Sequence, residues 1–303
     1  MPELPDIVVY LEALRERIEG KRLERIRLAS PFFLRTFDPP KEEFIGKTLR
    51  GVSRIGKRLV FEFDDDLFAV IHLMIAGRFR WLGTAAKLPG KLVLAAFDFD
   101  DGTLVVTEAG SRKRASLHLA RGRKLVQIHD RGGIEPLEAT LEDFSAALRS
   151  ERHTLKRTLT DPRIFSGIGN SYSDEILHSA RLSPTQLSTN LDDEEIERLF
   201  IATQTTLYEW IERLRKERGG KFPEKVTAFR PEMAVHGKYD QPCPVCQSPV
   251  QRIVHADNET NYCTRCQTGG KLLADRALSK LLKNDWPKTL EEMEDLREEN
   301  SKM

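Results

Sequence analysis

Residues 167–175 read Gly-Ile-Gly-Asn-Ser-Tyr-Ser-Asp-Glu, and this stretch decides the fold of the second half of the 303-residue chain. The glycines allow close backbone approach, and a helix that opens at Asn170 presents free N–H groups at its start. Free N–H groups at a helix start bind phosphate. Gly-x-Gly-Asn alone is a weak motif, whereas Gly-Ile-Gly-Asn-x-Tyr-x-x-Glu is a specific one.

Helical patterns lie on both sides of this stretch. Thr140-Leu141-Glu142-Asp143 resembles the capped start of a helix through Leu148, and a second helical run covers roughly residues 151–160. A long helix is expected from about Asp192 to Glu217, because apolar residues recur there on one side. Gly219 and Gly220 then open an irregular stretch that runs to about residue 240.

The first half of the chain carries a different pattern. Apolar residues recur at helical spacing in residues 5–19, and Gly20 supplies a stop. Between about residues 22 and 125, short alternating or apolar runs predict strands, with a hairpin turn at Asp101-Gly102. We therefore expect an antiparallel β-sandwich with one leading helix, followed by a helical part, which together make an α+β fold.

Composition and charge restrict the class of protein. The chain is 40% hydrophobic and 31% charged, and it has no apolar run near the ~20 residues that a membrane span needs. The N-terminal stretch is acidic and lacks the pattern of a secretory signal, so a cytoplasmic location is expected. Net charge is +1, but residues 112–124 hold six bases and no acid. This basic run is either a phosphate-neutralising stripe or a solvated face.

The four cysteines form two close pairs. Cys243, Cys246, Cys263 and Cys266 have the spacing Cys-x2-Cys-x16-Cys-x2-Cys, and no cysteine is left over. This spacing is typical of a tetrahedral zinc site, and four thiolates leave no open position for catalysis. We therefore predict one structural Zn²⁺ that stabilises a small two-stranded ribbon. Two disulfides or redox pairs are the alternative, which suits a cytosolic protein poorly.

Domain boundaries are placed where these patterns change. The stretch 127–133 is the expected linker because it is irregular and ends in two glycines. The expected parts are a β-sandwich domain at 1–126, the linker at 127–133, a helical domain at 134–235, a zinc finger at 236–270 and a C-terminal extension at 271–303.

The N-terminal sequence Met1-Pro2-Glu3-Leu4-Pro5 becomes a specific motif when it is combined with three distant segments. Gly56-Lys57-Arg58-Leu59, residues 167–175 and the four-cysteine ribbon follow it in order. At these separations, the combination resembles the formamidopyrimidine-DNA glycosylase / endonuclease VIII family over about residues 1–270. The resemblance implies an N-terminal β-sandwich, a helix–two-turn–helix module and a zinc finger. It also implies that the substrate is double-stranded DNA with damaged bases or abasic sites. The protein is expected to be a monomer of the bacterial type that is associated with the nucleoid.

The resemblance assigns the catalytic roles to three residues. Once Met1 is removed, Pro2 presents a secondary amine that attacks the sugar C1′ and expels the base. An α-amino group has a pKa near 8, so at neutral pH it is roughly two orders of magnitude richer in the nucleophilic form than a lysine. Glu3 is expected to deliver a proton to the opening sugar ring. Lys57 matches a family lysine that touches phosphate and sugar.

Five further residues are expected DNA contacts, and three of them stand where the sequence departs from the family. Asn170 and Lys156 match positions at the phosphate clamp. Ile75 occupies the position of the methionine wedge, and Arg112 lies in a loop, Thr107 to Arg114, where Asp-Pro-Arg-Arg-Phe-Gly is usual. Asn258 stands where the family usually places a phosphate-gripping arginine between the cysteine pairs. Loss of that cation weakens the hold on a flipped nucleotide.

Two functions from different classes follow. The first is a base-excision-repair glycosylase that also cleaves abasic sites by β,δ-elimination and acts on oxidised or ring-opened bases. The alternative is a lesion-binding protein, or an abasic-site lyase with little glycosylase activity. Joint presence of Pro2, Glu3 and Lys57 favours the enzyme, because a pure binder has no need of a free amine beside an acid. The acidic end of the C-terminal extension is expected to be a solvated tail, and the alternative is a flexible segment that binds a partner or screens the protein's own charge.

Overall fold

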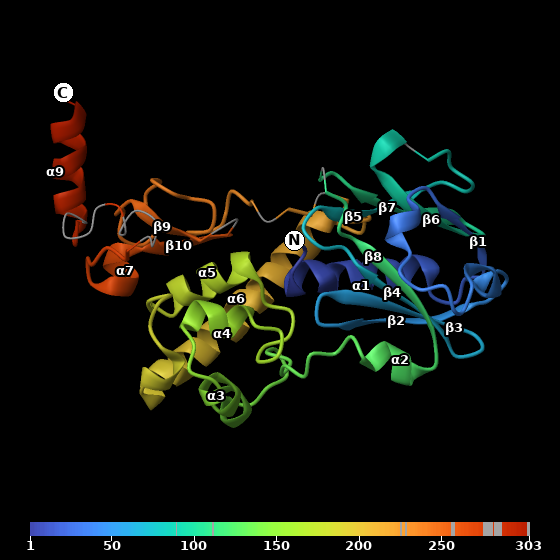
Figure 1. Ribbon diagram of the computed structural model, residues 1–303, viewed down its shortest axis with the longest axis horizontal. Helices are drawn as coiled ribbons and strands as arrows, with labels where there is room; N and C mark the ends of the chain where they lie inside the picture. The colour runs from blue at the N-terminus through green and yellow to red at the C-terminus, as the bar shows by residue number, and fades with distance from the viewer. Residues whose placement is uncertain are drawn as a thin grey trace. The chain divides into compact units, whose positions relative to one another are not determined.

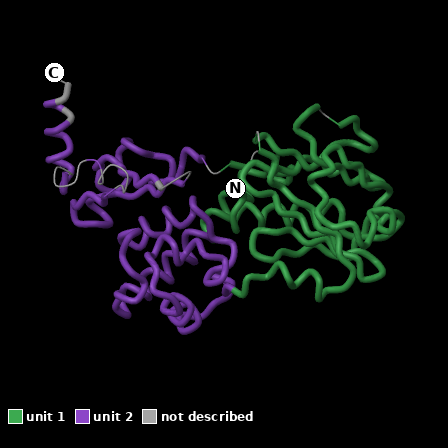
Figure 2. Tube along the Cα trace, in the orientation of Figure 1, with its two compact units in different colours: residues 1–132, 208–228 green, residues 133–207, 229–303 purple. Residues whose placement is uncertain are grey.

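The computed structural model describes residues 1–88, 90–110, 112–224, 226–227, 229–255, 258–274, 281 and 287–301. The chain forms two compact units, residues 1–132 with 208–228 and residues 133–207 with 229–303 (Figure 2). The expected boundary at residue 235 differs from this grouping. The reason lies in the long helix α6 (Asp193–Arg218), whose last residues from Tyr208 belong to the first unit. Among the described residues, no helix is both long and apolar enough to cross a membrane.

The first unit is a sandwich of two four-stranded antiparallel sheets (Figure 1). One sheet has the order β1-β6-β7-β5 and the other has the order β2-β3-β4-β8. The strands are β1 (Leu23–Leu28), β2 (Leu49–Ile55), β3 (Arg58–Phe63), β4 (Leu67–His72), β5 (Gly77–Leu82), β6 (Val93–Phe99), β7 (Gly102–Glu108) and β8 (Ser116–Arg121). The predicted β-sandwich is confirmed.

Helix α1 (Leu4–Ile18) covers β2 and β3 and completes the core of the sandwich. Its residues Ile7, Leu11, Leu14 and Ile18 are buried in one cluster with apolar residues of both sheets. Each fully buried side chain of this size contributes about 1.5–3 kcal/mol of hydrophobic free energy. The helix ends before Gly20, as the sequence predicts, and the φ of +79° at Gly20 suits glycine.

The hairpin between β6 and β7 turns one residue earlier than predicted. Gly102 pairs with Phe99 as the first residue of β7, so Asp100 and Asp101 form the turn. A Cβ on Gly102 would lie 2.2 Å from Cζ2 of Trp81. The glycine is therefore needed because an aromatic ring lies over the strand, rather than for the turn itself.

Short elements complete the first unit. Three 3-10 helices, η1 (Pro31–Phe33), η2 (Lys41–Phe44) and η3 (Gly90–Leu92), lie in its connections. Helix α2 (Arg123–Gln127) lies against β4 and β8. Its last residue, Gln127, is the first residue of the predicted linker, and the residues that follow Gln127 are irregular. Val126 of α2 packs on the face of the sheet that points away from the core, with Val60, Phe68 and Val70.

The second unit begins with helices α3 (Leu141–Arg149), α4 (Leu155–Thr160) and α5 (Asn170–Ser179), a 3-10 helix η4 (Ser188–Asn190), and the start of α6. The predicted capping box is present, since Thr140 Oγ accepts a bond from the Asp143 N–H at 3.1 Å. Phe144 of α3 packs on Phe165 and Phe200, with ring centroids 4.8 and 5.4 Å apart. The predicted helical part is thus built around aromatic contacts.

The second unit ends with the zinc finger and a helix. Strands β9 (Val250–His255) and β10 (Asn258–Cys263) form an antiparallel hairpin, and helix α7 (Thr264–Thr268) follows. Leu272 N–H donates to the Lys288 carbonyl at 2.8 Å, which joins the start of the C-terminal extension to the residues just before its last helix. Within this extension the acidic stretch expected to be a solvated tail forms helix α9 (Leu290–Ser301).

Candidate active site and metal centre

The chain start is fixed by the first turn of α1. Pro2 and Glu3 are buried, and Glu3 is the residue that caps the helix. Its N–H donates to the Asp6 carboxylate at 3.0 Å. Pro5 lies in the first turn, where its missing N–H would have had no helical partner and its fixed φ suits the helix. The sequence Pro-Glu-Leu-Pro-Asp therefore holds Pro2 and Glu3 at the buried start of α1.

The charges around the terminal amine come from separate parts of the first unit. Burial lowers the pKa of the Met1 α-amino group, and Arg78 and Lys57 lower it further, while Glu3 and Asp6 act in the opposite direction. A lowered pKa leaves more of an amine in its neutral, nucleophilic form at pH 7. The structure thus brings Glu3 and Lys57, which the sequence singled out, into one electrostatic environment with the chain start.

The loop after β4 presents Ile75 to solvent. Ile75 is 56% exposed, while Met74 is half-buried. Gly77 N–H donates to the Leu73 carbonyl at 2.9 Å, and a Cβ on Gly77 would lie 2.1 Å from that oxygen. The Arg78 guanidinium donates to the carbonyls of Ile75 and Gly77 at 3.2 and 2.6 Å. The tight turn and Arg78 therefore hold an apolar side chain outward.

The loop after β7 is organised by Glu108, which sequence reasoning missed. The Glu108 side chain is 1% exposed and accepts from the N–H of Arg114 at 3.0 Å and of Ala115 at 3.2 Å. The ammonium of Lys113 donates to the Glu108 carbonyl. Arg112 is exposed. A single acid just before a run of bases was the available signal, and it fixes how this basic loop is presented.

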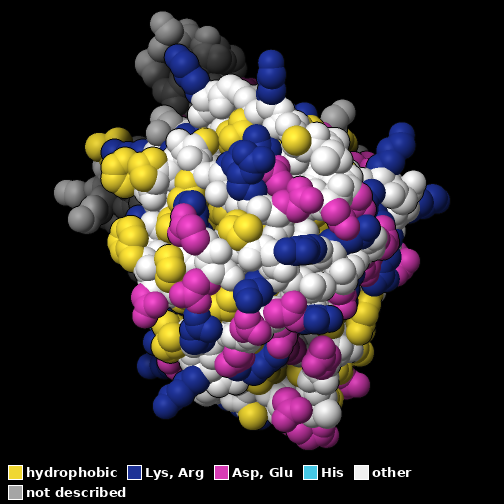
Figure 3. Space-filling view, turned by 90° about the vertical axis from the view of Figure 1, so that its right-hand side faces the viewer, with side chains coloured by type: hydrophobic (Ala, Val, Ile, Leu, Met, Phe, Trp, Pro, Cys, Tyr) yellow, Lys and Arg dark blue, Asp and Glu magenta, His cyan; other side chains and the backbone are white. Residues whose placement is uncertain are grey.

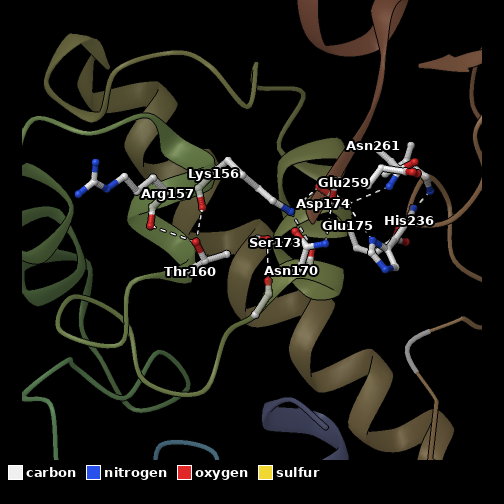
Figure 4. A network of polar contacts seen from close by, with 12 residues as sticks. Lys156, Arg157, Thr160, Asn170, Ser173, Asp174, Glu175, His236, Glu259 and Asn261 are labelled. Atoms are coloured by element: carbon white, nitrogen blue, oxygen red, sulfur yellow. Dashed lines mark hydrogen bonds and ion pairs between the residues drawn. The ribbon is translucent and has the colours of Figure 1, made fainter. Parts of the chain in front are cut away.

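Lys156 and Asn170, both expected to contact DNA, are engaged inside the second unit (Figure 4). The Lys156 ammonium lies 2.5 Å from the Asp174 carboxylate and donates to the Asn170 carbonyl at 2.6 Å. The Asn170 side-chain amide donates to the Glu259 carbonyl of β10 at 2.8 Å. These two residues therefore join α4, α5 and the finger to one another.

Helix α5 continues this network along one face, since residues 170, 174 and 178 are four apart. Asp174 is also 2.8 Å from Nδ1 of His236. The neighbouring Glu175 carboxylate accepts from the N–H groups of Ala234, Val235 and His236 at 2.7–2.9 Å. Burial is the main cause that raises the pKa of Glu175, and these three N–H groups act against it. Residues 234–236 are thus held to α5 by two carboxylates.

The four cysteines form the candidate metal centre. Their Sγ atoms all lie within 4.8 Å of one another, and none is in a disulfide. A tetrahedron of thiolates at the Zn–S distance of about 2.3 Å requires S–S separations of about 3.8 Å. Two of the separations, Cys243–Cys266 and Cys246–Cys263, are 3.9 and 3.3 Å. The donor set fits zinc, and the predicted structural site is confirmed.

A histidine from outside the finger touches this centre. Nε2 of His178, on α5, lies 3.3 Å from Sγ of Cys243, and both residues are buried. Burial and then Arg181 lower the pKa of His178, which favours the neutral imidazole with one N–H to donate. Asn258, at the start of β10, is exposed.

Three family models match consecutive parts of the chain. Residues 1–132 match the Formamidopyrimidine-DNA glycosylase N-terminal domain, and residues 133–218 match the Formamidopyrimidine-DNA glycosylase H2TH domain. Residues 240–269 match the Zinc finger found in FPG and IleRS.

Known proteins agree with these matches over most of the chain. A formamidopyrimidine-DNA glycosylase of Heliobacterium modesticaldum is 31% identical over 283 residues, which cover 88% of this chain and 100% of that protein. One from Listeria monocytogenes is 28% identical, with the same coverage. The Lactococcus lactis FPG bound to DNA that contains Fapy-dG is 28% identical with a TM-score of 0.78, covering 88% and 100% of the two chains. Its complex with abasic-site DNA has a TM-score of 0.77, 28% identity and coverage of 88% and 99%.

Proposed function

The chain belongs to the formamidopyrimidine-DNA glycosylase family, and from that premise we propose that it is a bifunctional DNA glycosylase and abasic-site lyase of base-excision repair. The observation that carries the proposal is the geometry of the chain start, where Pro2 and Glu3 are adjacent and buried at the cap of α1 and the charge of Lys57 acts on the chain start. The relatives' DNA complexes contain Fapy-dG or an abasic site, which supports damaged DNA as the substrate.

In the proposed reaction the Pro2 nitrogen, freed by removal of Met1, forms a bond to C1′. The bond from C1′ to the base breaks, and the base leaves with the electron pair and takes up a proton. Glu3 gives a proton to the ring oxygen as the sugar opens, so that an iminium ion joins Pro2 to C1′. Loss of a C2′ proton then expels the 3′ phosphate, and a second elimination expels the 5′ phosphate.

Lys57 and the zinc finger have supporting roles in this proposal. Lys57 follows β2 at the turn into β3, and its charge acts on the terminal amine, so a phosphate bound there would lie close to the reacting sugar. Cys243, Cys246, Cys263 and Cys266 would hold a zinc ion that stabilises the finger and takes no part in bond breaking. Ile75 and Arg112 are the proposed side chains that enter the duplex, because both lie exposed in loops of the first unit.

A second candidate is an abasic-site lyase with little base excision. The observation in its favour is Asn258, which is exposed at the start of β10 and carries no charge to grip a flipped nucleotide. Since the relatives compared are bacterial, we further propose that the protein acts on nucleoid DNA in the cytoplasm. We propose a monomer as its working form.

Two duplexes of identical sequence distinguish these functions, one with a formamidopyrimidine and one with a preformed abasic site. The full chain, with Pro2 confirmed as the first residue by mass spectrometry, is incubated with each. Cleavage of both, with phosphates on both sides of the gap, supports the bifunctional enzyme. Cleavage of the abasic duplex alone supports the lyase, and cleavage of neither contradicts both.

A further inference from the structure

A group of arginine and histidine side chains lies on the outer face of the sheet β2-β3-β4-β8, beside Lys57. Arg58 pairs directly with His72 across β3 and β4, and His118 of β8 pairs with Val70 of β4. Residues directly opposite each other share a face, and alternate residues of a strand return to it. Arg58, His72 and His118 therefore share one face, which is the face that Val60 and Val70 share with α2.

The chain that leaves α2 adds a histidine and an arginine to this face. The ring of His129 lies against the ring of His118, with centroids 4.8 Å apart and planes at 61°. Arg131 follows two residues later, and its charge acts on both His129 and Arg58. Arg58, His118 and His129 are half-buried, while Arg131 is exposed. The four side chains thus line a cationic surface at the end of the sheet where Lys57 lies.

The four side chains of this surface are not paired with an acid within the described part of the chain, and Asp130, which lies between His129 and Arg131 in the sequence, accepts instead from the Gly132 N–H at 2.8 Å. Among the residues that the structure describes, Arg58, His118, His129 and Arg131 make no side-chain hydrogen bond or ion pair. Burial is the main cause that lowers the pKa values of Arg58, His118 and His129, and the neighbouring charges that lower them further are all cations. Because the lowered pKa values keep His118 and His129 neutral at pH 7, the positive charge of this surface comes from Arg58 and Arg131. These two guanidinium groups repel each other, and a bound anion relieves that repulsion.

The other end of the same face shows the opposite arrangement. Arg123 of α2 lies 2.6 Å from Glu62 of β3, and its guanidinium lies over the ring of Phe68. Basic and acidic side chains are also interspersed over the face of the molecule drawn in Figure 3. Absence of acids near Arg58 and His118 is therefore a local feature and not a property of the whole surface.

We propose that Arg58, His118, His129 and Arg131 bind a DNA backbone phosphate and extend the DNA contact surface from Lys57 onto the outer face of this sheet. A guanidinium offers two parallel N–H donors to phosphate oxygens, and a neutral imidazole offers one. Both therefore suit a phosphodiester, which carries one negative charge and accepts several hydrogen bonds. This inference rests on the proposed function, because it assumes that damaged DNA is the ligand.

The test uses the full zinc-loaded chain and a duplex with a stable abasic-site analogue. The affinity is measured at several salt concentrations for the unchanged protein, for Arg58→Gln/His118→Gln and for Arg131→Gln, which is exposed and should not disturb folding. Loss of one phosphate contact lowers the slope of log affinity against log salt by about 0.9. Arg123→Gln is the matched control on the same face, and its slope should equal that of the unchanged protein.

Duplexes with one neutral methylphosphonate at successive positions then identify the phosphate. We expect one position that weakens binding by the unchanged protein and has no further effect on the double variant. Equal slopes and equal methylphosphonate profiles for the unchanged protein and all three variants would overturn the proposal.

Inorganic phosphate separates this site from the proposed function. If the protein fails to bind the damaged duplex, the proposed function fails, and the site is then judged by phosphate alone. Saturable shifts of the imidazole proton signals of His118 and His129, lost in Arg131→Gln, would support an anion site. No shift up to millimolar phosphate, in a protein that does not bind the duplex, would overturn the site as well.

Discussion

Helix α5 and the outer face of the sheet β2-β3-β4-β8 both carry several polar side chains, but they use them differently. On α5, Asp174 contacts Lys156 and His236, and Glu175 accepts three backbone N–H groups. On the sheet, Arg58 and His118 have no polar partner among the described residues. Buried polar groups that are paired hold a structure together, whereas unpaired polar side chains at a surface are available to a ligand. The comparison separates the scaffold of this protein from its binding surface.

Substitution of Glu3 at the chain start gives the largest expected effect on activity, because Glu3 both caps α1 and is the proposed general acid. Glu3→Gln removes the proposed general acid but keeps the shape and the backbone bond to Asp6. Because such a group contributes typically 10²–10⁴-fold, base removal should fall by about that factor, measured in single-turnover assays. The melting temperature should change little, since Gln keeps the packing. Activity within a few-fold of the unchanged protein would remove Glu3 from the mechanism.

The buried pair on α5 gives the next largest effect. Asp174→Asn leaves the Lys156 ammonium, whose side chain is 13% exposed, without its charge partner. Breaking a buried pair on one side costs about 3–5 kcal/mol, so the second unit should melt at a clearly lower temperature by calorimetry. Glu62→Gln, which breaks the exposed pair with Arg123, is the control and should cost less than about 1 kcal/mol. Equal effects of the two substitutions would mean that the buried pair on α5 stabilises the protein no more than the exposed pair on the sheet.

His178 should affect the zinc centre while leaving the fold in place. His178→Phe keeps the ring but removes the N–H that faces Cys243 Sγ at 3.3 Å. Loss of a partner of this kind costs metal sites about 10–100-fold in affinity, so transfer of zinc to a competing chelator should begin at lower chelator concentration. His153→Phe, at a half-buried histidine near Glu151, is the control. Identical zinc affinity for folded His178→Phe would mean that the contact between His178 and Cys243 does not stabilise the zinc site.

The histidines of the sheet give the smallest effect, seen in the dependence of stability on pH. Burial and neighbouring cations lower the pKa values of His72 and His129 to about 4. Between their ordinary value of about 6.5 and about 4, the folded protein binds fewer protons than the unfolded chain. The contribution of these histidines to the free energy of unfolding should therefore be fully present above about pH 6.5 and decrease as the pH falls toward 4. His129→Gln should flatten this decline in thermal melts, and an unchanged profile would contradict the cause assigned to it.

Sequence patterns predicted what depends on local spacing. The capping box at Thr140 and the leading helix are of this kind, because each follows from residues a few positions apart. The four-cysteine cluster was predicted from the spacing within and between its two close pairs. Contacts between residues far apart in the chain could not be predicted from such patterns. The pairing of Arg58 with His72 requires the strand register, and the bond from Asn170 to Glu259 spans 89 residues. Lys156 matched a family position, but only the structure shows that its ammonium lies against Asp174.

The terminal amine remains the centre of the account, and its chemistry can be captured directly. The full chain, with Pro2 confirmed as its first residue, is mixed with a duplex that carries an abasic site and is reduced with borohydride. We predict a covalent adduct of protein and DNA whose DNA-bearing peptide begins at Pro2. An adduct on a lysine, or no adduct from a protein that still cleaves the duplex, would contradict the proposed nucleophile.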